Sequence, residues 1–216
     1  MAKDISKILM VMRKAKDRDP IIINETPFQV LIATVLSQRT KDKNTALASK
    51  RLFEKYPDAK SLSGAPINEI RKLIRPAGFY RVKAQRVKEI ASTLVEKHGG
   101  AVPTSLEQLL ALHGVGRKTA NCVLVYAFKK PALPVDVHVH RISNRLGLVK
   151  TSAPEETELA LAKIVLKRNW IELNHLMVRY GQKICLPRHP RCEKCALASE
   201  CNYFKSLAGQ VARKRP

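Results

Sequence analysis

The stretch SLEQLLALHGVGRKTANCVLVYAF, residues 105–128, decides the fold of this chain. Apolar residues recur every three or four positions on both sides of Gly114 and Gly116, which predicts two helices joined by a tight turn. The second helix should begin near Arg117, where unpaired N–H groups and the positive end of the helix dipole favour an anion. Gly114, Val115, Gly116 and Arg117 are therefore candidates for binding a phosphate group. The alternative is an ordinary glycine-rich turn between packed helices.

The charge of the chain indicates its class of partner. Its 216 residues include 40 Lys and Arg but 18 Asp and Glu, which gives a formal net charge of +22. Such an excess attracts polyanions, so nucleic acid is the leading partner, although ribosomal proteins and basic secreted factors share this composition. The apolar content of 45% is enough for one large domain or two small ones.

The sequence carries no sign of membrane insertion or secretion. No apolar run approaches the length of a membrane span. The N-terminal residues MAKDISKILMVMRKAKDRDP have too short an apolar stretch, and no small-residue cleavage site, for a secretory signal. We therefore expect a cytoplasmic, nucleoid-associated protein with no membrane partner.

Helical spacing extends over nearly the whole chain and predicts about ten helices. Asp42 is expected to cap the helix of residues 43–56, and Pro66 is expected to occupy the first position of a later helix. The segment PVDVHVH, residues 134–140, differs because it alternates with period two and would pass as a short strand on pattern alone.

Four of the five cysteines lie close together, with the spacing C-x6-C-x2-C-x5-C: Cys185, Cys192, Cys195 and Cys201. In a reducing compartment this grouping indicates metal ligation rather than disulfides. Four thiolates suit either tetrahedral zinc or a four-iron cluster. The fifth cysteine, Cys122, lies in an apolar helical pattern and is expected in the core.

Two basic segments are candidates for DNA contact. Arg188 and Arg191 lie between the first two clustered cysteines and could meet phosphate, although a solvated loop is the alternative. The segment GFYRVKA, residues 78–84, places Phe79 and Tyr80 within a run rich in Lys and Arg. An enzyme that extrudes a base needs a bulky residue in such a place, whereas a packed aromatic is the alternative for Tyr80.

Three ordered motifs resemble the endonuclease III superfamily of DNA repair enzymes. LHGVGRKTANCVL, residues 112–124, resembles its helix-hairpin-helix, PVDVHVHR, residues 134–141, resembles its segment with the catalytic aspartate, and the cysteine spacing resembles its iron–sulfur motif. The resemblance runs from about residue 20 to residue 203. It implies an all-α fold in which DNA lies in a cleft between two domains: a helical barrel of residues 20–133 and a cluster domain of residues 1–19 with 134–216. It also makes PVDVHVHR the start of a helix, capped by Asp136 and ended by Gly147.

The resemblance implies a DNA glycosylase that is also an abasic-site lyase, with damaged bases, chiefly oxidised pyrimidines, in double-stranded DNA as its substrate. Lys118 would attack the sugar and form a Schiff base that leads to strand cleavage. A lysine is mostly ammonium at neutral pH, but a helix N-terminus and the adjacent Arg117 disfavour that charged form. Asp136 would orient the amine, accept its proton or stabilise the cationic sugar. The ordinary alternatives are a solvated lysine and a capping aspartate.

Other expectations also rest on the resemblance. The four cysteines would hold a [4Fe-4S] cluster, and Phe79 would act as a wedge in the base stack. His138 could touch phosphate or sugar, and a capping or packing role is the alternative. The family fills the gap left by the extruded base with a glutamine in a segment like LSSQTKD. This chain has LSQRTKD, residues 36–42, so either Gln38 or Arg39 takes that role. We expect the protein to be a monomer.

Three rival functions remain at this level. A glycosylase of the same superfamily that removes mismatched adenine, thymine or uracil without cleaving the strand would lack a lysine at position 118. A non-enzymatic hairpin module would bind undamaged and damaged DNA alike. A redox-sensing iron–sulfur regulator would respond to oxidation without releasing any base.

Overall fold

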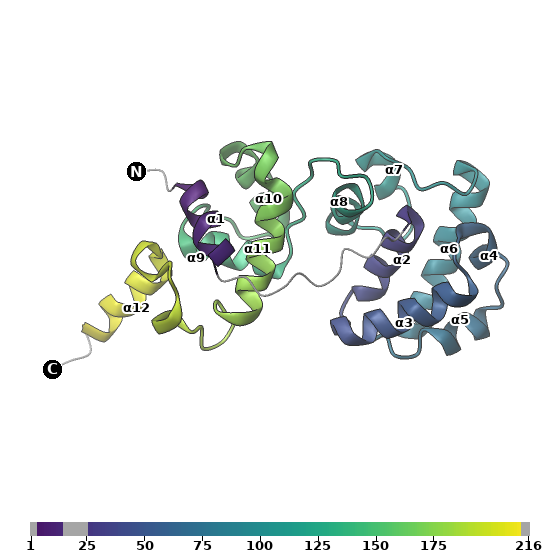
Figure 1. Cartoon of the computed structure of the whole chain (residues 1–216), viewed down its shortest axis with the longest axis horizontal. Helices are drawn as coiled ribbons and strands as arrows, with labels where there is room; N and C mark the ends of the chain where they lie inside the picture. The colour runs from purple at the N-terminus through teal and green to yellow at the C-terminus, as the bar shows by residue number, and fades with distance from the viewer. Residues whose placement is uncertain (1–3, 15–25, 213–216) are drawn as a thin grey trace. The chain divides into compact units, whose positions relative to one another are not determined.

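The computed structural model describes residues 4–14 and 26–212, with side chains as far as residue 207. Most of these residues are in helices and none is in a β-strand, which confirms the predicted all-α class. The described helices are α1 (Ile5–Lys14), α2 (Pro27–Ser37), α3 (Asp42–Lys55), α4 (Ala59–Ser63), α5 (Ile67–Leu73), α6 (Tyr80–His98), α7 (Leu106–Leu110), α8 (Arg117–Tyr126), α9 (Val137–Leu146), α10 (Pro154–Ile164), α11 (Trp170–Lys183) and α12 (Asn202–Ala212) (Figure 1). In the described ranges, no helix has both the length and the apolar character needed to cross a bilayer.

The chain divides into two compact units. The barrel unit, as we call residues 22–130, contains α2 to α8, and the cysteine unit, residues 1–21 with 131–216, contains α1 and α9 to α12. The boundary that the sequence suggested at residues 19 and 20 lies outside the described residues. Each unit is described by itself below.

The core of the barrel unit forms around α6, which packs against α2, α4 and α5. One face of α6 buries Val87, Ile90 and Leu94 at helical spacing, and Gly99 ends the helix in a left-handed conformation with φ 59°. Helix α2 is apolar along most of its length, and a capping box between Thr26 and Gln29 fixes its start. Because α2 also packs against α8, its C-terminal end leads directly towards the hairpin.

The hairpin consists of α7, a tight turn and α8. Gly114 has φ 80°, a left-handed conformation that glycine adopts without strain, and Gly116 caps α8. A Cβ atom at Gly114 would lie 2.2 Å from Cδ of Arg86, so the turn also depends on a close approach that only glycine permits. Leu112 and Val115 are buried on either side and hold the turn against the core.

The cysteine unit has a core of its own, in which α9 packs against α10, α11 and α12, and α1 packs against α11. Its buried side chains come from four helices and three loops: Ile8, Leu9, Met12, Leu133, Val135, Val139, Ile142, Leu146, Leu161, Val165, Leu173, Leu176, Met177, Tyr180, Leu197 and Cys201. The segment PVDVHVHR leads into α9, with Asp136 as its cap and Gly147 as its end, as the resemblance implied. The period-two pattern of this segment does not reflect a strand, because Val137 and Val139 both lie in α9, where Val139 is buried and Val137 is exposed.

Two helix starts differ from the sequence prediction. Asp42 is the first residue of α3 rather than its cap, and Lys41 precedes it without a side-chain capping bond. An acidic side chain in the first turn is favoured by the helix dipole without capping. Pro66 precedes α5 rather than beginning it, because its carbonyl accepts the first helical bonds, from Glu69 N at 3.0 Å and Ile70 N at 3.2 Å.

Candidate functional site

Lys118 lies in the first turn of α8, directly after the tight turn of the hairpin. The first helical bond runs from Ala120 N to the Gly116 carbonyl, at 2.9 Å, so the amides before it have no acceptor inside the helix. The Lys118 side chain is exposed, and within the described residues it makes no hydrogen bond or ion pair. This end of α8 therefore presents main-chain donors, a positive dipole end and a mobile amine at one place.

The turn after α2 holds Gln38 and Arg39 in different positions. Gln38 is partly buried and donates from Nε2 to the Gly114 carbonyl at 3.4 Å and to Thr119 Oγ1 at 3.3 Å. Its Oε1 accepts a bond from Arg86 Nη1 at 3.1 Å. Gln38 is thus committed to the hairpin, whereas Arg39 is exposed.

Phe79 lies beside Arg39 in space, although 40 positions separate them in the sequence. The Arg39 guanidinium carbon is 5.9 Å from the centroid of the Phe79 ring, a cation–π geometry. Phe79 is 64% exposed, an unusual state for a large apolar side chain. The structure therefore brings Gln38, Arg39 and Phe79 together with the hairpin in the barrel unit.

Asp136 caps α9 with one of its two carboxylate oxygens. Oδ1 accepts bonds from His138 N and Val139 N, both at 2.9 Å, while Oδ2 accepts none within the described part of the chain. Lys118 belongs to the barrel unit and Asp136 to the cysteine unit. The aspartate thus has one oxygen committed to the fold and one left for chemistry.

His138 is held in one tautomer by its neighbour. Arg141 Nη2 lies 3.0 Å from His138 Nδ1, and because arginine only donates, Nδ1 must accept and the ring hydrogen is on Nε2. Arg141 also donates to the carbonyls of Gly181, at 3.2 Å, and Cys185, at 2.8 Å. It connects the first turn of α9 to the start of the cysteine loop.

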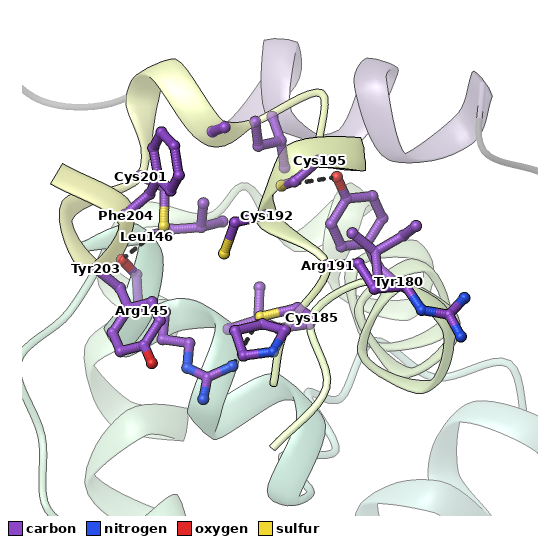
Figure 2. A pocket seen from close by; sticks show the side chains of 15 residues that line it. Arg145, Leu146, Tyr180, Cys185, Arg191, Cys192, Cys195, Cys201, Tyr203 and Phe204 are labelled. Carbon is purple, nitrogen blue, oxygen red and sulfur yellow. Dashed lines mark hydrogen bonds between the residues drawn. The ribbon is translucent and has the colours of Figure 1, made fainter. Parts of the chain in front are cut away.

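The four clustered cysteines line one partly open pocket in the cysteine unit. Figure 2 shows them around an open space, with Cys195 next to Tyr180. The remaining walls are mostly apolar, and include Ile142, Leu146, Ile184, Leu197 and Phe204. In the described ranges, no three His, Cys, Asp or Glu side chains converge closely enough to hold a single metal ion. The sulfur atoms surround a space instead of meeting at a point.

The surroundings of the cysteines combine an effect of burial on Cys192 with two hydrogen-bond donors. Burial, and then the neighbouring thiols, raise the pKa of Cys192. Two donors nevertheless face the sulfurs: Arg145 Nη1 lies 3.4 Å from Cys185 Sγ, and the Tyr180 hydroxyl lies 3.2 Å from Cys195 Sγ. Burial raises the pKa of Tyr180, so its hydroxyl keeps its proton. Four thiols with an N–H and an O–H donor beside them fit a thiolate-bound metal centre.

Arg188 and Arg191 are exposed in the loop between Cys185 and Cys192. The loop is anchored at both ends, because Arg191 N donates to the Ile184 carbonyl at 3.0 Å and Arg145 Nη2 donates to the Pro187 carbonyl at 2.9 Å. The backbone at Arg188 and Arg191 is therefore held in place by these bonds.

The sequence matches the family described as HhH-GPD superfamily base excision DNA repair protein over residues 32–167. It is 54% identical over 189 residues to endonuclease III of Thermotoga maritima, a match that covers 88% of this chain and 89% of that protein. This chain belongs to the endonuclease III family. Its fold is that of a trapped endonuclease III–DNA covalent intermediate, with a TM-score of 0.87 and 37% identity over 94% of this chain and 97% of the other. A thermostable thymine-DNA glycosylase is similar at TM-score 0.82 and 29% identity, over 93% and 94% of the two chains.

Sequence reasoning missed two residues that organise the site of this endonuclease III relative. Arg86 contacts Gln38 and lies against Gly114, and Lys83 binds the turn that carries Gln38. A signal for Lys83 was present, because it lies on the apolar face of α6, four residues before Val87 and seven before Ile90. A charged residue on a buried helix face needs hydrogen-bond partners, so the segment that packs against it is a candidate for a structured turn.

Proposed function

We propose that this protein removes damaged bases, chiefly oxidised pyrimidines, from double-stranded DNA and then cleaves the strand at the abasic site by β-elimination. The observation that carries the proposal is the exposed Lys118 amine at the start of α8, beside the amides of the hairpin. The trapped covalent complex of a 37% identical endonuclease III supports it, since such a complex requires a nucleophile on the protein.

Lys118 supplies the nucleophile. Its neutral amine attacks the sugar carbon that carries the damaged base, the N–C bond forms, and the base leaves with the electron pair of the glycosidic bond and takes up a proton. The ring then opens to a protonated imine. Loss of a proton from the adjacent sugar carbon expels the 3′ phosphate, and water finally releases the lysine.

Asp136 supplies negative charge to the same reaction. Its Oδ1 is committed to the amides of His138 and Val139, which fixes the carboxylate, while Oδ2 remains able to accept a proton or to oppose positive charge on the sugar. We propose this role rather than capping alone.

Both the barrel unit and the cysteine unit contribute DNA contacts. Amides of Gly114, Gly116 and Arg117 bind phosphate, whereas the predicted contact from Val115 is not proposed for its amide, because its N–H donates to the Leu112 carbonyl at 3.0 Å. Phe79 enters the base stack, and one of Gln38 and Arg39 fills the gap left by the base. In the cysteine unit, we assign phosphate or sugar contacts to His138, Arg188 and Arg191. Residues 20–133, and residues 1–19 with 134–216, act as the two domains of the enzyme.

We infer that Cys185, Cys192, Cys195 and Cys201 hold a [4Fe-4S] cluster. The support is the pocket that all four line, together with the N–H and O–H groups that face two of the sulfurs. When bound, the cluster supplies positive charge that keeps four close thiols deprotonated. The surrounding chain then holds the loop with Arg188 and Arg191 in one conformation.

Borohydride trapping tests the lyase reaction. Reduction of the imine should leave the protein covalently attached to DNA that contains an abasic site, and Lys118→Gln should abolish both the attachment and strand cleavage. Lys97→Gln, which removes an equal charge from an exposed lysine in the last turn of α6, should trap like the native protein. Efficient trapping by the Lys118 variant would assign the chemistry to another amine.

The similarity to a thymine-DNA glycosylase makes base release without strand cleavage the second candidate. It predicts that heat or alkali is needed to break the strand after base release. Lys118 favours the first candidate, because a glycosylase that uses only water needs no amine at this position.

A further inference from the structure

Lys83 is a buried ammonium group that binds the turn after α2. It is 3% exposed, and its Nζ donates to the Leu36 carbonyl at 2.7 Å, to the Gln38 carbonyl at 2.5 Å and to Thr40 Oγ1 at 2.7 Å. An ammonium has three donors, and all three are used here. A single side chain from α6 therefore holds the chain on both sides of Arg39, through two backbone carbonyls before it and the Thr40 side chain after it.

That backbone is in an unfavourable conformation. Arg39 has φ 52° and Phe79 has φ 58°, both in the left-handed region that side chains other than glycine avoid. Strain of this kind persists only where surrounding contacts impose it, and it is concentrated at functional sites. Arg39 and Phe79 are also the pair in cation–π contact, so the strained backbone supports two adjoining exposed side chains.

The turn and the loop before α6 are locked to each other. Gly78 N donates to Thr40 Oγ1 at 3.1 Å, so the Thr40 hydroxyl is bound both by Lys83 and by this loop. A Cβ atom at Gly78 would lie 2.8 Å from the Arg39 carbonyl oxygen, closer than a backbone contact allows. Lys83, Thr40 and Gly78 thus form one clamp beneath Arg39 and Phe79.

We propose that Lys83 is a positioning residue that decides which side chain of the turn faces DNA: it holds Arg39 outward beside Phe79 and Gln38 inward against the hairpin. This inference rests on the proposed function, since it assumes that the turn meets damaged DNA. Lys83 itself touches no DNA.

The Gln38 side chain is held inward by its own hydrogen bonds, in addition to the clamp on the backbone. Its side chain amide uses both ends, towards Arg86 and towards Gly114 and Thr119, and so cannot enter a base gap without breaking these bonds. Arg39 is the exposed neighbour. The residue that fills the gap is therefore Arg39, and loss of the clamp would let the turn relax to an unstrained conformation that no longer presents it.

The charge state of Lys83 is compatible with this role. Burial, with the nearby positive charge of Arg86 as the second cause, lowers the pKa of Lys83 to about 8. The ammonium is therefore the main form at neutral pH, and it has a donor for each of its three acceptors.

The test compares affinity for a duplex that contains a tetrahydrofuran abasic-site analogue with affinity for the intact duplex, at one salt concentration. Lys83→Met keeps the length of the side chain but removes its donors, and should reduce the ratio of the two affinities about tenfold, the loss expected when a side chain no longer stacks in the base gap. Lys88→Met is the matched control, because Lys88 lies on the same helix and donates to the Ala65 carbonyl at 2.6 Å, away from the turn. It should leave the ratio unchanged.

A double-mutant cycle with Arg39→Ala tests whether Lys83 acts on the affinity ratio through Arg39. Arg39→Ala should reduce the ratio by about the same factor as Lys83→Met, and the double variant should lose no more than either alone. If Lys83→Met folds poorly, Thr40→Val removes one acceptor of the clamp and should act in the same direction.

Three outcomes would overturn the inference: an unchanged ratio in Lys83→Met, equal weakening on both duplexes, or additive losses in the double variant. Failure of the proposed function is distinguishable, because the native protein would then not be trapped on abasic DNA by borohydride. A native protein that traps, with a Lys83 variant that discriminates normally, refutes the clamp alone.

Discussion

Substitution of Asp136 separates its structural role from its chemical one. Asparagine caps helices as well as aspartate does, so Asp136→Asn should keep both Oδ1 bonds and change the free energy of unfolding by only a few tenths of a kcal/mol. Alanine removes both bonds, so Asp136→Ala should cost about 1 kcal/mol, which lowers the melting temperature of a chain of this size by about 2–4 °C.

Activity should follow charge and not stability. Both variants lack the carboxylate that opposes the cationic sugar, so the single-turnover rate of base release should fall by about two to four powers of ten in each. Thermal denaturation and base release from a duplex with one oxidised pyrimidine measure the two effects independently.

Asp58→Asn is the matched control. Asp58 caps α4 with a bond from Ser61 N at 2.8 Å, in the barrel unit, and the same change there should leave base release unaffected. Asp136 would be a cap and nothing more if Asp136→Asn released the base at the native rate.

Four further predictions concern the hairpin, the basic loop, Lys83 and the cluster. Gly114→Ala should destabilise the protein by more than about 1 kcal/mol in thermal denaturation, because the residue has a left-handed conformation and its new Cβ would displace Arg86. Gly64→Ala should be tolerated, because no atom lies closer than 4.0 Å to a Cβ at that position. Neutralising Arg188 and Arg191 should make the slope of log affinity against log salt shallower by about 2 without changing lesion preference, and a changed preference with an unchanged slope would mean that the loop reads bases. The pKa of Lys83 is lowered to about 8 in the folded protein. Between pH 8 and 10.5 the folded chain has therefore released a proton that the unfolded chain still holds, so the native protein should gain stability relative to Lys83→Met as pH rises through this range. The gain is complete above 10.5 and is lost as pH falls through 8, and parallel stability curves for the two proteins would contradict it. The purified protein should be brown and contain about four iron atoms per chain, whereas stoichiometric zinc without visible absorbance would overturn the cluster assignment.

The sequence determined the features that depend on near neighbours along the chain. Gly114 and Gly116 indicated the turn and the start of α8 at Arg117, because the conformation they permit is local. The helix starting at Asp136 was different, because period-two alternation suggested a strand and the family resemblance was needed to identify the cap. The position of Asp42 was predicted one residue wrongly, since a cap and a first-turn acid carry the same sequence signal.

Only the tertiary structure decided the difference between Gln38 and Arg39. Both are polar, adjacent and suited to a DNA-facing turn, so nothing local distinguishes them. Their positions depend on Lys83, Arg86 and Gly114, which are more than 40 residues away in the sequence and come close only when α2, α6 and α8 pack together. The cysteine spacing likewise indicated a metal site, but the pocket that all four cysteines line forms only when α9, α11 and the C-terminal loop come together. Residue types and spacing fix which chemistry is possible, whereas the hydrogen-bond partners that orient each side chain are set by contacts between distant segments.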